Sequence, residues 1–167
     1  VNPGADMLIT AFRWWHIAEV MPIEDELFGV ERWSDAMFWS ELANGHYYRV
    51  ALADPTVTSG PDERSATGDA EVIGYAGMAM NGPDEAWVQT IGVCRRWQGR
   101  GVGRALLEDL LAEARRRGAY QMLLEVAVDN QRAQRLYARY GFEPIGIRRG
   151  YYQPSNTDAL VMKKEPL

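Results

Sequence analysis

Cysteine and histidine are scarce in this chain, and each shortage excludes a kind of chemistry. Among 167 residues there are one cysteine, Cys94, and two histidines, His16 and His46. A single cysteine cannot form an internal disulfide or a cysteine-rich metal cluster. The two histidines are thirty positions apart, which is not the spacing of a zinc site or of a histidine-activated nucleophile. The sequence therefore predicts no metal ion, and Cys94 is expected to be a small buried residue.

A surplus of basic residues and a long apolar run are also missing. The 18 Lys and Arg residues are outnumbered by 23 Asp and Glu, and the formal net charge is −5. This balance does not favour nucleic acid as a partner, because nucleic-acid-binding domains carry a basic patch. The most apolar early stretch, 7–21, contains Arg13 and His16, is too short to span a bilayer and follows no basic segment. We therefore expect a cytoplasmic protein that does not bind membranes.

The length and the hydrophobic content fit one compact domain. With 47% hydrophobic residues, the chain is long enough for one core and too short for two ordinary domains. Residues 1–6 precede Met7 and are expected to be either a leader or a ragged start that is not part of the fold, which leaves 7–167 as the domain. Residues 54–69 collect Pro, Ser, Thr, Gly and Asp, and predict a long exposed loop.

Hydrophobic periodicity predicts an alternation of strands and helices. Apolar residues at helical spacing indicate helices over 15–28, with Pro22 as a place where the helix could split, and over 35–43, 101–118 and 130–140. Ser34 is the predicted N-cap of the second of these helices. Alternating or continuous apolar runs indicate strands over 7–12, 47–53, 72–80, 86–93, 121–128, 142–151 and 159–163. The turn at 81–84 makes the central strands antiparallel.

Three glycines alternate with other residues where the third predicted helix begins. The stretch 96–104 reads RWQGRGVGR, with glycine at positions 99, 101 and 103. The N–H groups of such a loop are able to converge on one point, and the following helix adds the positive end of its dipole. The Lys-Ser/Thr pair of nucleotide loops is absent, and the third glycine of the dinucleotide pattern would fall on Leu106. The loop therefore indicates a phosphate site of another design, or else a plain helix-opening turn.

Two distant motifs resemble the GNAT acetyltransferases. The spacing Gln-x-x-Gly-x-Gly, met by Gln98, Gly101 and Gly103, is similar to the acetyl-CoA pyrophosphate loop of that family. The second half of the GNAT core is matched in order and spacing by Leu124-Glu125-Val126, Asn130 and LYARYGF at 136–142.

The resemblance covers most of the chain from Trp87 onward and narrows to one branch of the family. The segment 124–162, which includes IRRGYY at 147–152, resembles the RimI enzymes, which acetylate the N-terminal alanine of small-subunit ribosomal protein eighteen. The implied fold is a single α/β GNAT domain with a mixed, mostly antiparallel, twisted sheet of about seven strands and helices on both faces. The implied co-substrate is acetyl-CoA, and the implied partner is a protein N-terminus.

The resemblance assigns two catalytic side chains. Glu125 is the only charged residue in the apolar run MLLEVAV at 122–128, where a carboxylate needs a partner, water or substrate. It matches the general base, although a salt-bridged glutamate is the alternative. Tyr137, twelve positions further on, matches the residue that protonates the departing thiolate, although a core aromatic is the alternative. Because Cys94 lacks a base partner, direct attack in a ternary complex is expected.

The resemblance also implies how acetyl-CoA is held. The pantetheine arm would pair like an added strand with the end of the 86–93 strand, where the Val93 N–H is the oxyanion donor. A bulge near that end would splay this strand from the 121–128 strand and make room. Asn130 would bind the arm, cap the following helix, or do both. The expected cofactor-binding residues are Ile91, Gly92, Val93, Gln98, Gly99, Arg100, Gly101, Val102, Gly103, Arg104, Asn130 and Tyr137.

The acceptor side is less defined by the sequence. Trp33, Tyr151 and Tyr152 are the expected substrate residues, the two tyrosines by resemblance to the RimI peptide groove. The acidic residues Glu24, Asp25, Glu26 and Glu31 either attract a cationic N-terminus or form a solvated helix face, and the solvated face is favoured. One alternative is a GNAT enzyme that acts on a small amine or a lysine side chain. The other is a non-catalytic acyl-CoA sensor or interaction module, against which the presence of both Glu125 and Tyr137 argues.

Overall fold

The computed structural model describes residues 7–53 and 70–167. Within them, seven strands form one sheet in the order β1-β2-β3-β4-β5-β7-β6. The β4–β5 pair is parallel, and every other neighbouring pair is antiparallel. The strands are β1 Met7–Ala11, β2 Tyr47–Ala53, β3 Val72–Met80, β4 Glu85–Val93, β5 Gln121–Ala127, β6 Glu143–Tyr152 and β7 Thr157–Lys164. The leader expected over 1–6 and the loop expected over 54–69 lie outside the described residues.

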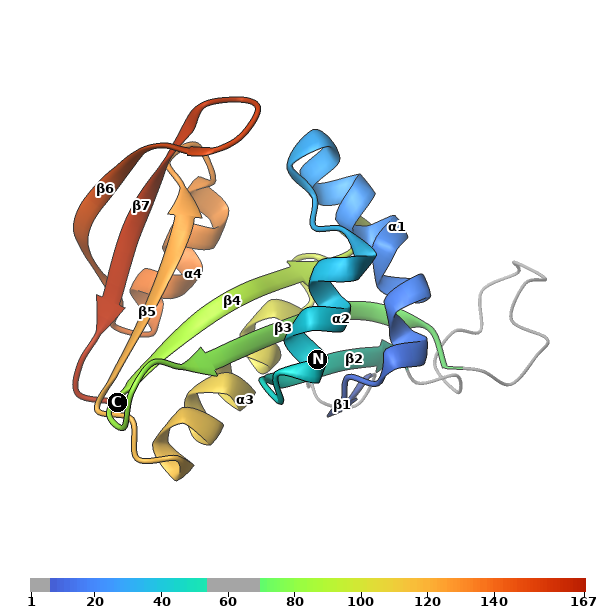
Figure 1. Ribbon diagram of the computed structural model, residues 1–167, viewed down its shortest axis with the longest axis horizontal. Helices are drawn as coiled ribbons and strands as arrows, with labels where there is room; N and C mark the ends of the chain where they lie inside the picture. The colour runs from blue at the N-terminus through green and yellow to red at the C-terminus, as the bar shows by residue number, and fades with distance from the viewer. Residues whose placement is uncertain (1–6, 54–69) are drawn as a thin grey trace.

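Four α-helices cover both faces of this sheet (Figure 1). They are α1 Ile17–Phe28, α2 Asp35–Ala43, α3 Val102–Arg116 and α4 Gln131–Arg139. The first two lie on one face, and α3 and α4 lie on the other. The mixed, mostly antiparallel α/β sheet predicted from the sequence is confirmed. Three short 3-10 turns complete the described elements: Trp14–His16, Gly29–Glu31 and Arg95–Trp97.

The helices follow the sequence signals closely. Helix α1 runs through Pro22 without a break, although a proline inside a helix removes one backbone hydrogen bond. Val20 and Ile23 on either side of it are buried in the core. Ser34 caps α2, since its side chain accepts a hydrogen bond from the Met37 N–H. Helix α3 buries the predicted apolar stripe of Leu106, Leu107, Leu110, Leu111 and Ala114.

Two glycines let tyrosine rings lie flat on the central strands. A Cβ atom on Gly77 would lie 2.2 Å from the ring of Tyr48, and one on Gly92 would lie 2.6 Å from the hydroxyl of Tyr75. The Tyr48 hydroxyl donates to the Glu41 carboxylate at 2.7 Å. Backbone without a side chain is therefore required where these rings cross β3 and β4.

Strands β4 and β5 separate after a short stretch of pairing. The parallel ladder joins Glu85–Trp87 to Gln121–Leu123 and ends there. On its other side, β4 has an irregular register with β3, because Met78 pairs with Val88 while Gly77 pairs with Thr90. Gln89 is thus the extra residue of a β-bulge, which bends the strand and increases its twist. The predicted bulge and splay are confirmed, and Figure 1 shows the two strands diverging as a V.

The packing of Tyr48 on Gly77 gives a stability prediction. Gly77→Ala is expected to lower the free energy of unfolding by about 1–3 kcal/mol, because the added methyl overlaps a ring that Glu41 holds in place. Gly146→Ala is the matched control, since a Cβ there meets nothing within 4 Å. It should change stability by less than about 0.5 kcal/mol. Chemical denaturation of both variants measures the difference, and equal stabilities would contradict this packing.

Candidate active site

The open edge of β4 faces the gap that the splay creates. The Cys94 N–H donates to the Ile73 carbonyl at 3.0 Å, so the backbone N–H of Cys94 points toward β3. Backbone direction alternates along an antiparallel strand, and the N–H groups of Ile91 and Val93 therefore point away from β3. Cys94 itself is buried, and burial raises the pKa of its thiol, which disfavours a thiolate nucleophile.

The glycine loop begins at the end of this open edge. Gly99 and Gly101 have φ angles of 77° and 86°, in the left-handed region that favours glycine, and α3 starts directly after Gly101. The Gln98 amide ties the loop down by donating to the Val93 carbonyl at 3.0 Å. The N-terminal end of a 15-residue helix therefore lies beside the last residue of β4, which suits an anion.

Arg132 on α4 also reaches this loop, and the sequence analysis did not include it. Its Nη1 donates to the side-chain oxygen of Gln98 at 3.0 Å. A Cβ on Gly99 would lie 3.2 Å from its Nη2. The usable signal was its place two residues after Asn130 at the start of a helix. Asn130 does cap α4, because its side-chain oxygen accepts from the Ala133 N–H at 3.2 Å.

The other loop residues divide into buried and charged positions. Val102 is buried in the core, whereas Arg100 lies over the ring of Trp97 at 5.0 Å. Arg104 lies near Glu108, with 3.6 Å between its Nε and the carboxylate. The loop and its flanks thus carry several arginines around one helix start, at positions Arg95, Arg96, Arg100, Arg104 and Arg132.

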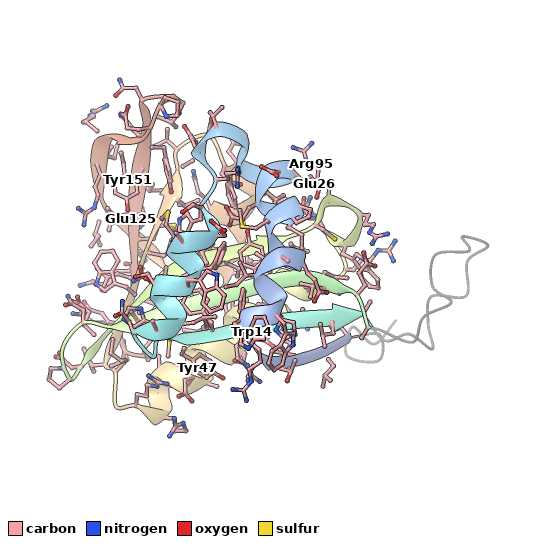
Figure 2. All side chains as sticks on the ribbon, turned by 45° about the vertical axis from the view of Figure 1, so that its right-hand side comes forward. Trp14, Glu26, Tyr47, Arg95, Glu125 and Tyr151 are labelled. Carbon is pink, nitrogen blue, oxygen red and sulfur yellow. The ribbon has the colours of Figure 1, made fainter. Side chains whose placement is uncertain are left out.

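Glu125 lies on β5 among partners from β6. Its side chain is 17% exposed, and its Oε1 is 2.9 Å from the Nε of Arg148. The Tyr151 hydroxyl lies beside this carboxylate, and burial together with the carboxylate raises the pKa of Tyr151 to about 12. Figure 2 shows Glu125 and Tyr151 next to each other on this part of the sheet. The carboxylate in the apolar strand is therefore salt-bridged, yet still reachable from solvent.

Tyr137 is brought to the same region from α4. It is 4% exposed and its ring packs edge-on against Phe142, with 5.9 Å between centroids. Burial raises the pKa of Tyr137, and the nearby Tyr152 adds to the rise. The pKa of Tyr152 is raised by burial, then by Tyr151 and by Glu125. Tyr152 is thus within electrostatic range of both Tyr137 and Glu125, and these phenols are neutral at physiological pH.

Two segments far apart in the sequence meet above the splay. The hydroxyl of Ser155, in the β6–β7 loop, bonds the carboxylate of Glu31, which follows α1. Figure 1 shows this loop and the end of α1 facing each other across the open side of the V. Trp33 lies in the same connection, but its ring packs on Phe38 at 5.3 Å.

Glu24 corrects one expectation from the sequence. It was assigned to a solvated acidic face, yet it is 0% exposed and accepts hydrogen bonds from the Tyr75 hydroxyl and, at 2.9 Å, from the Trp33 N–H. The physical reason is its helical position, seven residues after Ile17 and four after Val20, which places it on the inner stripe of α1. It anchors the α1–α2 connection to β3.

Neighbouring acidic residues have separate partners. Glu26 accepts from the Arg95 N–H at 3.0 Å and so joins α1 to the turn before the glycine loop (Figure 2). Asp25 pairs with Arg32 at 2.7 Å.

Across the described ranges, no group of three or more His, Cys, Asp and Glu side chains is placed to hold a metal ion. None of the described helices has the length and apolar character needed to cross a membrane.

Comparisons with known proteins agree with this geometry. The sequence model of the acetyltransferase (GNAT) family matches residues 14–142. The chain therefore belongs to the GNAT acetyltransferase family, as its motifs predicted, and it is an acetyl-CoA-dependent acetyltransferase.

Two related proteins and one solved structure that resemble this chain are RimI or ribosomal-protein-alanine N-acetyltransferases by name. The N-alpha-acetyltransferase RimI of Mycobacterium tuberculosis is 39% identical over 147 residues, which cover 86% of this chain and 82% of that protein. A putative ribosomal protein bS18-alanine N-acetyltransferase of Bacillus subtilis is 28% identical over 146 residues, 87% of each chain. The crystal structure of the Escherichia coli ribosomal-protein-S18-alanine N-acetyltransferase superposes with a TM-score of 0.76 at 27% identity, over 96% of this chain and 94% of that one.

The buried position of Glu24 gives a prediction about pH. Burial raises its pKa, so the folded state holds a proton that the unfolded state releases above its ordinary pKa of about 4.3. Its contribution to stability is present below that value and is lost as the pH rises through the folded pKa. The free energy of unfolding of the native chain minus that of Glu24→Gln should therefore fall from pH 4 to pH 8.

Glu113 supplies a control of opposite sign. Hydrogen bonds from Arg116, then Arg117, hold its pKa at about 2, so its contribution is present above the unfolded pKa and is lost as the pH falls. The same difference taken with Glu113→Gln should rise with pH between about 2 and 5. Denaturant titrations across this range test both residues, and a Glu24→Gln difference that stays flat would contradict the assignment.

Proposed function

We propose that this enzyme acetylates the N-terminal α-amine of a protein, in the manner of RimI. The observation that carries the proposal is the Glu125 carboxylate, held on β5 beside the open edge of β4 and beneath the meeting point of the α1–α2 connection and the β6–β7 loop. The favoured acceptor is the N-terminal alanine of small-subunit ribosomal protein eighteen, a substrate named for the B. subtilis and E. coli relatives. Such an acceptor would place the reaction in the cytoplasm.

The acetyl-CoA site follows the open edge of β4 and the glycine loop. The N–H groups of the loop 98–104, at the positive end of α3, would bind the pyrophosphate, with Arg132 as an additional cation. The pantetheine arm would pair with the free backbone of 91–93 as an added strand. Asn130 uses its side-chain oxygen to cap α4, which leaves its amide N–H groups to donate to the arm.

Catalysis needs a neutral amine, a base, an oxyanion donor and a group that assists the leaving thiolate. Glu125 would accept the proton of the amine while the nitrogen attacks the thioester carbon. The N–H of Val93 points into the splay and would donate to the oxyanion. As the carbon–sulfur bond breaks, the thiolate would receive a proton or a hydrogen bond from the Tyr137 hydroxyl.

Burial decides which of these contributions Tyr137 makes. A thiol has an ordinary pKa of about 8.5, and the pKa of Tyr137 is raised above that of a free phenol. Complete proton transfer to the thiolate is therefore uphill, and a hydrogen bond from a neutral hydroxyl is the main form of assistance. An acyl-enzyme on Cys94 is disfavoured, because burial raises the pKa of its thiol and the thiolate is the nucleophilic form.

The identity of the acceptor is testable with one peptide. An α-amine has a pKa of about 7.7–8.0, whereas a lysine amine has one of about 10.4, so a carboxylate base at neutral pH suits the former. With acetyl-CoA and an Ala-initiated peptide that also contains lysine, mass spectrometry should place the acetyl group on the first residue. Equal or faster labelling of the lysine, or of a free polyamine, would favour the alternative acceptors instead.

The role of Glu125 is testable by a single substitution. Glu125→Gln keeps the size of the side chain but removes the base, so turnover at pH 7 should fall by about 10²-fold or more. Calorimetric affinity for acetyl-CoA should stay unchanged. Glu143→Gln, on the exposed part of β6, is the control and should retain turnover. A folded Glu125→Gln variant with normal turnover would remove this residue from the mechanism.

A further inference from the structure

Arg148 is the cation nearest to the proposed base, and the strand register explains how it arrives there. Ala159 of β7 pairs with Ala127 of β5 on one side and with Arg148 of β6 on the other. Glu125 pairs with Val161, one place along the same face. Directly paired residues share a face of the sheet. The small side chain of Ala159 therefore leaves Arg148 free to lean across β7 to Glu125.

Two aromatic rings fix the guanidinium group in this position. Its central carbon lies 5.9 Å from the ring centroid of Trp87 and 5.9 Å from that of Tyr151. Trp87 is the last residue of β4 that pairs with β5, so the guanidinium stands where the splay opens. Cation–π contacts of this kind hold an arginine that is only partly desolvated.

The guanidinium group of Arg148 has N–H donors that its pairing with Glu125 does not use. Its Nε pairs with Glu125, and an arginine carries five N–H donors in a rigid fork. Its two terminal nitrogens have no hydrogen bond to any other described residue, and the side chain is 51% exposed. The free end of the fork therefore faces solvent beside the base.

An α-amine differs from a lysine amine by the group next to it. The carbonyl oxygen of the first residue lies three bonds from the terminal nitrogen, whereas a lysine nitrogen stands at the end of a four-carbon stem. A donor fixed beside Glu125 would reach the first kind of carbonyl when the amine is at the base. The same positive charge disfavours an ammonium group, and at neutral pH a lysine amine is protonated far more completely than an α-amine.

We propose that Arg148 is a specificity-determining residue whose free N–H groups bind the carbonyl oxygen of the first residue of the acceptor while its Nε stays with Glu125. The inference rests on the proposed α-amine acceptor and names the contact that selects it. Charge-assisted hydrogen bonds of this kind contribute about 10- to 100-fold in affinity or rate.

A double-mutant cycle between enzyme and acceptor tests this contact. The two acceptors are an Ala-initiated peptide and its analogue in which a trans alkene replaces the first peptide bond. The native enzyme and Arg148→Gln are compared by kcat/KM on both. The alkene also changes the pKa of the free amine, but this change is the same for both enzymes and cancels in the ratio.

The native enzyme should prefer the amide over the alkene, and Arg148→Gln should reduce this preference by about 10-fold or more. Arg149→Gln is the matched control, because Arg149 pairs with Asp158 at 2.9 Å, and it should keep the native ratio. If Arg148→Gln fails to fold by circular dichroism, Arg148→Lys replaces it. The compact ammonium group of this variant should stay paired with Glu125, and the preference for the amide over the alkene should fall in this variant as well.

The inference is overturned if the folded Arg148 variant and the native enzyme have the same ratio of kcat/KM for the amide to kcat/KM for the alkene. That outcome differs from failure of the proposed function. In the latter case the native enzyme acetylates lysine or a polyamine and leaves the α-amine of the peptide unmodified.

Discussion

The separation of β4 from β5 is the constraint on which the site depends. Parallel pairing stops at Trp87, and the bulge at Gln89 turns the rest of β4 away. A strand inside a sheet uses its N–H and C=O groups on both sides, but here one edge of β4 is released. The backbone of Ile91 and Val93 is thereby free for a ligand, while the sheet remains continuous at its base.

Elements on both faces of the sheet are tied to this opened edge. On one face, buried Glu24 and exposed Glu26 attach α1 to Tyr75 and to Arg95, so the α1–α2 connection is held over the end of β4. On the other face, Gln98 links the glycine loop to Val93 and to Arg132 of α4. The proposed cofactor loop and the proposed acceptor side are thus positioned by the same strand end.

Charge around Glu125 is balanced locally rather than left to solvent. Arg148 neutralises the carboxylate, and the neutral phenols of Tyr151 and Tyr152 lie within its field. Burying a carboxylate without such partners would cost several kcal/mol. The arrangement holds a paired carboxylate in an apolar strand and, in our proposal, gives the partner arginine a second role in recognising the acceptor.

The sequence by itself determined the elements, the fold class and the family, because apolar periodicity and the order of glycine, glutamate and tyrosine motifs are local properties that one chain displays. It also anticipated the splay, although only through resemblance. The tertiary structure alone decided which charges are buried and paired. Glu24 was misassigned because its neighbours are acidic, whereas its helical phase places it beneath Tyr75. The Glu125–Arg148 pair spans three strands, and the link from Arg132 to Gln98 joins segments thirty-four positions apart. Such contacts depend on strand register and helix placement, which no local pattern encodes.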